Sequence, residues 1–351
     1  MIRIIILSFI LITNQSFAKN KNLKTKKGQK VQIEEDYRGS VDLSEDGEIE
    51  EFQAVFQDAL DQINQMKSIK QINPCSALLG SGNLNEITCA EKYTQIYNKP
   101  TVDFKIVFGY LDTQEGYTSD LTMREALVAT LTTPCPEKKS NIYACGLSKD
   151  LDDADKFYKE VIDFKGEKHR VVFTIVNSSY SYSEEDNIAF AEQQKEQSQK
   201  AREAFLDGLQ NASVIIYNGH SRDGGGPDFD PPVLKKNNHV DYNWYHKNKP
   251  GLKQILSALE EGKKAGKKAP AVMAFNSCNS HLHFHRSLSQ AAPDSGLLMT
   301  TQSSYFIDEP YTTIGMINAI LGQFCEPSFS ASINGSPKID KGSRIKAFNF
   351  P

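Results

Sequence analysis

The chain has 351 residues, enough to bury a substantial hydrophobic core, and we expect one main α/β domain with an amino-terminal appendage. Its 40 Lys and Arg against 44 Asp and Glu give a formal net charge of -4 at pH 7. This balance offers no electrostatic case for a nucleic-acid partner, so the composition argues against that class of function.

The first 18 residues are typical of a secretory signal peptide. Arg3 supplies a basic start, an apolar run covers Ile4 to Ile12, and the small residues Ser16 and Ala18 precede the expected cleavage point. The apolar run is about half the ~20 residues that span a bilayer, and no later segment approaches that length, so we expect no stable membrane anchor. We therefore expect a protein exported to a periplasm or secreted.

Two charged blocks follow the signal. Lys19 to Lys30 carries six lysines, and Glu34 to Glu51 carries nine acidic residues. Such blocks are typical of disordered tails, so residues 19–47 are interpreted as a charged, disordered linker, with a removable pro-segment as the alternative. Residues 48–98 are expected to form a helical appendage, and residues 99–351 the main domain.

Segments of helical and strand-like pattern alternate along the rest of the chain. Apolar residues at spacings of three and four predict an amphipathic helix over residues 48–66, in the appendage. Strands are expected over residues 104–108, 171–176, 214–217, 272–275 and 297–300, and helices over residues 123–131, 151–162, 188–209, 252–259 and 313–321. Strands separated by helix-length crossovers predict an α/β fold, with a mostly parallel sheet covered by helices on both faces.

Six cysteines in an exported protein favour disulfide bonds. Cys75 with Cys89, and Cys135 with Cys145, bracket short loops and could close as two local disulfides. Cys278 and Cys325 are then left over. They could bond to each other, or one of them could be a reactive thiol.

Two of the expected strands end in similar sequence patterns, VIIYNGH at residues 214–220 and VMAFNSC at residues 272–278. If these strands are neighbours in a parallel sheet, about 4.8 Å apart, their matching length brings His220 and Cys278 to the same edge. That carboxyl edge is where open α/β sheets bind ligands. An imidazole there could activate the thiol as a nucleophile and protonate a leaving amine.

The segments VIIYNGHS and AVMAFNSCNS resemble the two catalytic elements of the caspase/legumain/gingipain superfamily of cysteine peptidases. That superfamily has a hydrophobic strand ending in His-Gly and a later one ending in Ala-Cys. The resemblance covers Thr101 to about Cys325 and implies a caspase-like fold, a thiol acyl-enzyme, and an oxyanion held by the backbone N–H groups of Ser221 and Cys278. Ser221 replaces the usual Gly, and Ser277 replaces the common Ala.

The function expected from these features is that of a cysteine endopeptidase acting on proteins or peptides, with Cys278 as nucleophile and His220 as general acid/base. No cofactor is expected. A catalytically inactive binding protein with the same fold is the alternative from another class. Residues 297–304 resemble the strand that shapes the specificity pocket in the superfamily, and the pocket-lining candidates are Asp228, Asp230, Ser303 and Ser304. No oligomeric state is implied.

The string GHSRD at residues 219–223 also resembles the G-x-S-x-G elbow of α/β-hydrolases, which would make Ser221 the nucleophile of an esterase. Asp223 stands where the last Gly is required, and the run GGGPDFDPP that follows cannot continue the helix that the elbow needs. We expect this loop to form one wall of a substrate cleft. Its acids Asp223, Asp228 and Asp230 could bind a basic side chain or calcium, although solvated acids are the simpler interpretation.

Three histidines alternate in the segment HLHFH, at His281, His283 and His285. They would share one face of an extended segment and diverge in a helix. Zinc is a weak alternative here, because neither a Cys-x-x-Cys pair nor an H-E-x-x-H helix accompanies them. The aromatic cluster around Trp244 is expected to pack its loop onto the domain, with a substrate platform as the alternative.

Overall fold

The structure is a computed structural model that describes residues 45–66, 84–111, 119–136, 140–304 and 306–350. The expected signal peptide, most of the expected charged linker and Cys75 lie outside these residues. Among the helices within them, none is both long enough and apolar enough to cross a bilayer.

The described strands form one sheet in the order β2-β3-β4-β1-β5-β6-β7-β8. Its strands are β1 Thr101–Phe108, β2 Ser148–Lys149, β3 Lys156–Ile162, β4 Lys168–Val176, β5 Val214–Asn218, β6 Val272–Asn276, β7 Gly296–Thr300 and β8 Ile345–Phe348. The central strands β4, β1, β5, β6 and β7 are parallel to their neighbours in this run, whereas β2, β3 and β8 add antiparallel edges. The predicted α/β fold with a mostly parallel sheet is confirmed.

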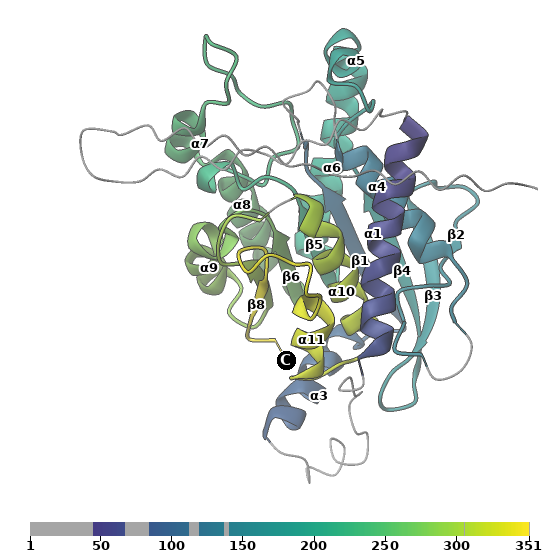
Figure 1. The fold of residues 1–351 in the computed structure, drawn as a ribbon. Coiled ribbons are helices and arrows are strands. Elements are labelled where there is room, and N and C mark those ends of the chain that lie inside the picture. Colours follow the sequence, from purple (N-terminus) through teal and green to yellow (C-terminus); the bar gives the residue numbers. More distant parts are fainter. Residues whose placement is uncertain (1–44, 67–83, 112–118, 137–139, 305, 351) are drawn as a thin grey trace, which may run out of the picture. The chain divides into compact units, whose positions relative to one another are not determined.

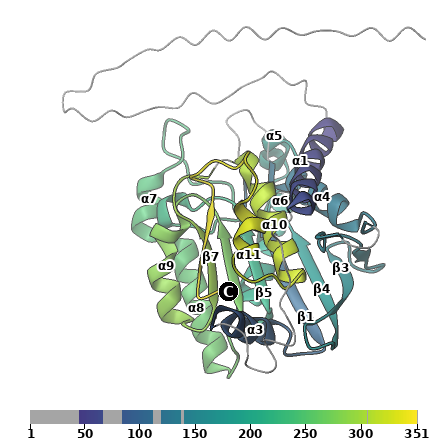
Figure 2. The same ribbon diagram turned by 60° about the horizontal axis from the view of Figure 1, so that its bottom comes forward.

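Helices cover both faces of this sheet, as Figures 1 and 2 show. One face carries α1 Glu45–Gln65, α3 Leu84–Ile96, α4 Ser119–Thr132, α10 Glu309–Leu321 and α11 Ser328–Asn334. The other carries α6 Ala191–Asn211, α8 Pro250–Lys264 and α9 Ser280–Ala291, while α5 Glu184–Ala189 and α7 Tyr242–Asn248 are shorter. Val214 and Ile216 of β5 pack in the first core and Ile215 and Tyr217 in the second, because successive strand side chains point to opposite faces.

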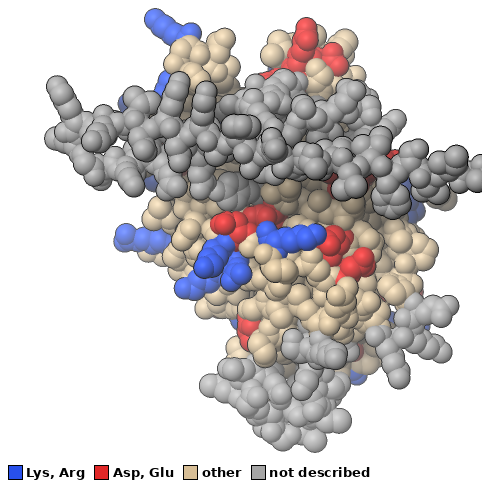
Figure 3. Space-filling view, in the orientation of Figure 1, with Lys and Arg blue, Asp and Glu red and all other residues tan. Residues whose placement is uncertain are grey.

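Helix α1 confirms the amphipathic pattern read in the sequence. Phe56, Leu60 and Ile63 are buried in the same core as the sheet. Asp58 accepts hydrogen bonds from the Tyr311 hydroxyl of α10 (2.5 Å) and from Lys338 (2.8 Å). The helix expected in an appendage therefore packs as part of the α/β unit. Figure 3 shows the face that α1 lies on, where acidic and basic side chains of described residues are intermixed.

The helix predicted over residues 151–162 is wrong, because this segment makes a turn and then strand β3. Asp150 accepts the backbone N–H groups of Asp152 (2.8 Å) and Asp153 (3.0 Å), which closes a turn that competes with a helix. Phe157 and Val161 are buried on one face of β3, and Leu151, which the helix pattern needed in the core, is 100% exposed. From Lys156 onward the side chains therefore follow the two-residue period of a strand.

The helix predicted over residues 188–209 is present but interrupted. Helix α5 ends at Ala189 and α6 begins at Ala191, with Phe190 between them at φ -104° and ψ 51°. Ser183 caps α5 by accepting the N–H of Asp186. Figure 1 shows α6 beside the sheet and α5 beyond the ends of the strands.

Two disulfides are present, and one predicted pairing is corrected. Cys135 and Cys145 are bonded as predicted, whereas Cys89 bonds to Cys325, 236 residues away in sequence, and therefore not to Cys75. The spacing of Cys75 and Cys89 suggested a local loop, but α3 buries Cys89 against the segment after α10, with a Cα–Cα distance to Cys325 of 5.8 Å. Cys278 is the free cysteine among the described residues.

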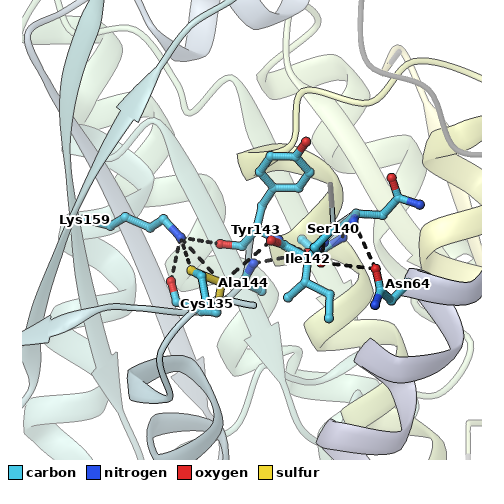
Figure 4. The surroundings of a disulfide bond; sticks show 10 residues. Asn64, Cys135, Ser140, Ile142, Tyr143, Ala144 and Lys159 are labelled. Carbon is cyan, nitrogen blue, oxygen red and sulfur yellow. Dashed lines mark hydrogen bonds between the residues drawn. A yellow bond between two sulfur atoms is a disulfide. The ribbon is translucent and has the colours of Figure 1, made fainter. Parts of the chain in front are cut away.

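The loop closed by Cys135 and Cys145 is held from two sides, as Figure 4 shows. The side-chain oxygen of Asn64, on α1, accepts hydrogen bonds from the Ser140 hydroxyl at 3.1 Å and from the backbone N–H that follows at 3.2 Å. Lys159 of β3 donates to the carbonyls of Tyr143 (2.7 Å) and Cys145 (2.6 Å). Burial lowers the pKa of Lys159 to about 8.

Candidate active site

His220 and Cys278 stand at equivalent positions on adjacent strands. Strands β5 and β6 are parallel neighbours, and Asn218 is paired with Asn276 in their register. His220 follows the first asparagine by two residues and Cys278 follows the second by two. Both residues are half-buried at the carboxyl edge of the sheet. The structure therefore brings these two predicted site residues to one edge.

A buried polar network fixes the two strand ends. The side-chain amide of Asn276 donates to the side-chain oxygen of Asn218 (3.1 Å) and to the hydroxyls of Thr312 (2.8 Å) and Thr313 (3.1 Å) on α10. Thr313 in turn donates to Asn218 at 2.5 Å. Sequence reasoning did not identify this network, although the asparagine that occurs in both strand texts was its signal.

Glu309 is the first residue of α10, and its backbone carbonyl accepts a hydrogen bond from Asn276 at 3.3 Å. Its side chain is 5% exposed. Burial raises the pKa of Glu309 well above its usual range, and the neighbouring Asp308 adds to the shift. The carboxyl group therefore keeps its proton at pH values where an exposed glutamate has lost it.

The backbone around His220 packs closely against Tyr217 and the end of β6. Gly219 has φ +151°, and a Cβ at this position would lie 2.7 Å from the Tyr217 hydroxyl. The N–H of Gly219 donates to the carbonyl of Asn276 (3.2 Å), and the Tyr217 hydroxyl donates to the carbonyl of His220 (3.1 Å). Glycine is required here because any side chain would displace Tyr217.

Ser221 occupies ordinary right-handed backbone space, with φ -78° and ψ -15°. A serine adopts these angles without strain, so this position does not need the backbone freedom of a glycine. Its carbonyl accepts the N–H groups of Gly224 (2.9 Å) and Gly226 (2.8 Å), and the chain then makes only the short 3-10 turn Arg222–Gly224. The helix that an esterase elbow requires does not follow Ser221.

The acids of the following loop are engaged within the chain. Asp228 is buried and accepts hydrogen bonds from the Arg222 guanidinium (3.0 Å) and the Tyr245 hydroxyl (2.7 Å). Burial raises the pKa of Asp228, and the charge of Arg222 opposes this shift. Asp230 pairs with Arg202 of α6, and Asp223 lies 3.3 Å from a ring nitrogen of His246. The three acids thus lie in separate pairs and do not converge on a common cation.

Cys278 leaves the sheet at a sharp turn. The next residue, Asn279, has φ +53° and precedes α9, so the electropositive end of this helix lies close to Cys278. The Cys278 thiol lies 3.4 Å from the Ser304 carbonyl oxygen and 3.8 Å from the Ser304 hydroxyl oxygen. Asn279 donates its backbone N–H to Gln302 (2.7 Å) and its side-chain amide to Ser303 (3.5 Å). The loop after β7, which holds two pocket candidates, therefore flanks the thiol.

The three alternating histidines lie on the helix α9 and do not share one face. His281 and His285 are one turn apart, with ring centroids 4.8 Å apart, and both contact Phe348. His283 lies instead beside Gly224, in the loop after His220. Burial lowers the pKa of His281, and the neighbouring His285 adds to this effect.

A small open cavity of about 100 Å³ lies beside the loop that follows His220. Its wall includes Trp244, Asp230 and Arg202, together with Pro227. Tyr245 is buried, and its ring lies perpendicular to that of Trp244, with the centroids 5.0 Å apart. Tyr245 therefore packs onto the domain, as expected of the aromatic cluster, whereas Tyr242 is 48% exposed and Trp244 38%.

Comparisons with models of known protein families, with curated proteins and with solved structures found no match.

Proposed function

We propose that this protein is a cysteine endopeptidase with a caspase-like fold, in which Cys278 is the nucleophile and His220 the general acid/base. The observation that carries the proposal is the register of β5 and β6, which pairs Asn218 with Asn276 and so sets the two reactive residues at equivalent positions of one sheet edge. Open α/β sheets bind their ligands at this edge. The free state of Cys278 supports the proposal too, because Cys325 is bonded to Cys89.

In the proposed reaction, the Cys278 sulfur attacks the carbonyl carbon of the scissile peptide bond. His220 takes the thiol proton and gives it to the leaving amine, and water then hydrolyses the thioester. The backbone N–H groups of Ser221 and Cys278 would bind the oxyanion. The unstrained φ and ψ of Ser221 support this role, since the departure from Gly does not force that peptide out of position.

The substrate is proposed to be a protein or peptide lying between two loops. Ser303 and Ser304 flank the thiol from the loop after β7, and the residues after His220 form the opposite wall. Asp228 is a poorer candidate for substrate contact, because Arg222 and Tyr245 already satisfy its carboxylate. Asp230 is half-exposed and pairs with Arg202 at the open cavity.

Export is part of the proposal, with residues 1–18 as the signal and the periplasm or the exterior as the destination. The bonds Cys89–Cys325 and Cys135–Cys145 support it, because disulfides persist in oxidising compartments. A thiol that stays free in such a compartment suits a catalytic residue better than a structural one.

Hydrolysis of a fluorescent casein tests the function. The wild-type protein should cleave it, Cys278→Ala should not, and Ser221→Ala should keep most of the activity because only the Ser221 backbone is used. Activity should survive a chelator. Loss of activity in Ser221→Ala with full activity in Cys278→Ala would point to an esterase-type site and contradict the proposal, and no hydrolysis by any variant would favour a binding protein.

A further inference from the structure

The hairpin between β3 and β4 gathers three potential metal ligands on one face. Val161 is paired with His169 across the hairpin, and the N–H of Asp163 donates to the carbonyl of Glu167 at 2.9 Å. Since side chains two residues apart on a strand share a face, Asp163, Glu167 and His169 point the same way. The hairpin lies where β4 begins, at the opposite edge of the sheet from His220 and Cys278.

The hydrogen bonds of Asp163 and His169 leave one free position on each side chain. One carboxylate oxygen of Asp163 accepts the backbone N–H groups of Lys165 (2.9 Å) and Glu167 (2.8 Å). The Nδ1 atom of His169 lies 2.8 Å from the carbonyl oxygen of Lys99, to which it donates. The other ring nitrogen, Nε2, then lies 3.4 Å from the second oxygen of Asp163.

Without a proton on Nε2 these two atoms are both acceptors, and both side chains are buried, with exposed fractions of 4% and 3%. Nε2 of His169 makes no hydrogen bond to any described residue. A buried nitrogen lone pair facing a carboxylate oxygen is unfavourable unless a positive charge lies between them. The charge can be a proton on the ring or a metal ion. A ring whose other nitrogen donates to a carbonyl has the arrangement typical of metal-binding histidines.

We propose that Asp163, Glu167 and His169 bind a divalent transition-metal ion of the zinc type, with water completing the coordination. Two ligand atoms at about 2.0–2.1 Å from a tetrahedral ion lie about 3.4 Å apart, which is the separation found between Asp163 and His169. One carboxylate oxygen of Glu167 lies within 4.8 Å of both ligand atoms. Its exposed side chain can close onto the ion from solvent and leaves a path for entry.

The mixture of one nitrogen and two oxygens favours zinc and its neighbours over calcium, which takes oxygen ligands throughout. The ion would join the two arms of the hairpin and act as a structural clip at the edge of the sheet. This site is independent of the dyad, so it does not depend on the proposed peptidase activity.

Titration calorimetry with ZnCl₂ tests the site in the full chain. Two other sets of residues could bind zinc, the dyad and the neighbouring His281 and His285, so the background is Cys278→Ala/His281→Ala/His285→Ala. We expect this protein to bind one zinc ion. Adding Glu167→Gln, an exposed change that should leave the fold intact, should weaken binding by about tenfold or more. His169→Gln should abolish it, and His239→Ala, an exposed control, should change nothing.

Either of two results would overturn the proposal. If the background protein binds no zinc, the charge between Asp163 and His169 is a proton, and the pair is an ordinary buried ion pair. If Glu167→Gln binds zinc as tightly as the background does, the ion lies elsewhere.

Discussion

Asn276 donates its side-chain amide to the side-chain oxygen of Asn218 across 3.1 Å, joining the carboxyl ends of β5 and β6. Thr313 of α10 donates to the same oxygen. Because His220 and Cys278 each follow one of these asparagines by two residues, the bond holds the two proposed catalytic residues at equivalent positions on the sheet edge. Helix α10 thus acts as the support of the proposed dyad, although it contributes no reactive group.

Asn276→Ala should destabilise the protein by about 1–3 kcal/mol. The change leaves the buried oxygen of Asn218 and the hydroxyl of Thr312 without the amide donor that they now share. Urea denaturation measures the loss. Asn237→Ala, an exposed matched control, should stay within about 0.5 kcal/mol of wild type. Equal stability of the two variants would show that the network does not support the strand ends.

Arg222→Ala should cost about 3–5 kcal/mol, because it leaves the buried carboxylate of Asp228 without its counter-charge. The loop after His220 depends on this pair, so the proposed activity should fall as well. Arg202→Ala removes a comparable ion pair from the half-exposed Asp230 and should cost at most about 1 kcal/mol. Thermal unfolding of both variants provides the comparison, and similar losses would mean that burial of the Arg222 pair is unimportant.

Removing the Cys89–Cys325 bond with a double alanine variant should destabilise the protein by about 2–5 kcal/mol, since this bond closes a loop of 236 residues and so restricts the unfolded chain strongly. The Cys135–Cys145 bond spans only 10 residues, and its removal should cost less. Guanidinium denaturation without reductant measures both. A larger loss from the short loop would contradict the ranking.

Asp120 should make stability depend on pH between about 4 and 6. Burial raises the pKa of this carboxyl from 3.8 to about 6, although Ser178 and Ser179 donate hydrogen bonds to it. The folded state therefore holds a proton that the unfolded chain has lost in this range, so stability falls as pH rises through it, by up to about 3 kcal/mol. In Asp120→Asn this part of the pH dependence should vanish. Urea denaturation at several pH values measures the free energy of unfolding. If it depends on pH in the same way in the two proteins, the Asp120 carboxyl does not titrate in this range.

The sequence predicted the parts of the fold that depend on local pattern. The strand texts ending at His220 and Cys278 are fully buried runs, and such runs read clearly as central strands of a parallel sheet. The turn at Asp150 was missed because its side chain, and not an apolar period, decides the local structure. The partner of Cys89 could not be read either, since a bond over 236 residues depends on where α3 packs.

The site residues also divide into those that the local sequence pattern predicts and those that depend on tertiary packing. The placement of His220 and Cys278 at one sheet edge could be inferred, because strand register turns sequence position into spatial position. The roles of the loop acids could not, because whether Asp228 faces substrate or Arg222 depends on how the loop folds back on itself. The Asp163 and His169 pair belongs to a hairpin whose first strand was predicted as helix, so its ligands were not seen together.

Labelling with a thiol-reactive peptide electrophile tests the central claim most directly, with the modified residue identified by mass spectrometry. The account predicts modification of wild-type protein at Cys278, no labelling of Cys278→Ala, and a rate lower by about 100-fold or more in His220→Ala. His239→Ala, an exposed control, should react like wild type. Labelling of Cys278 at an unchanged rate in His220→Ala, or modification at another residue, would contradict a dyad formed by these two side chains.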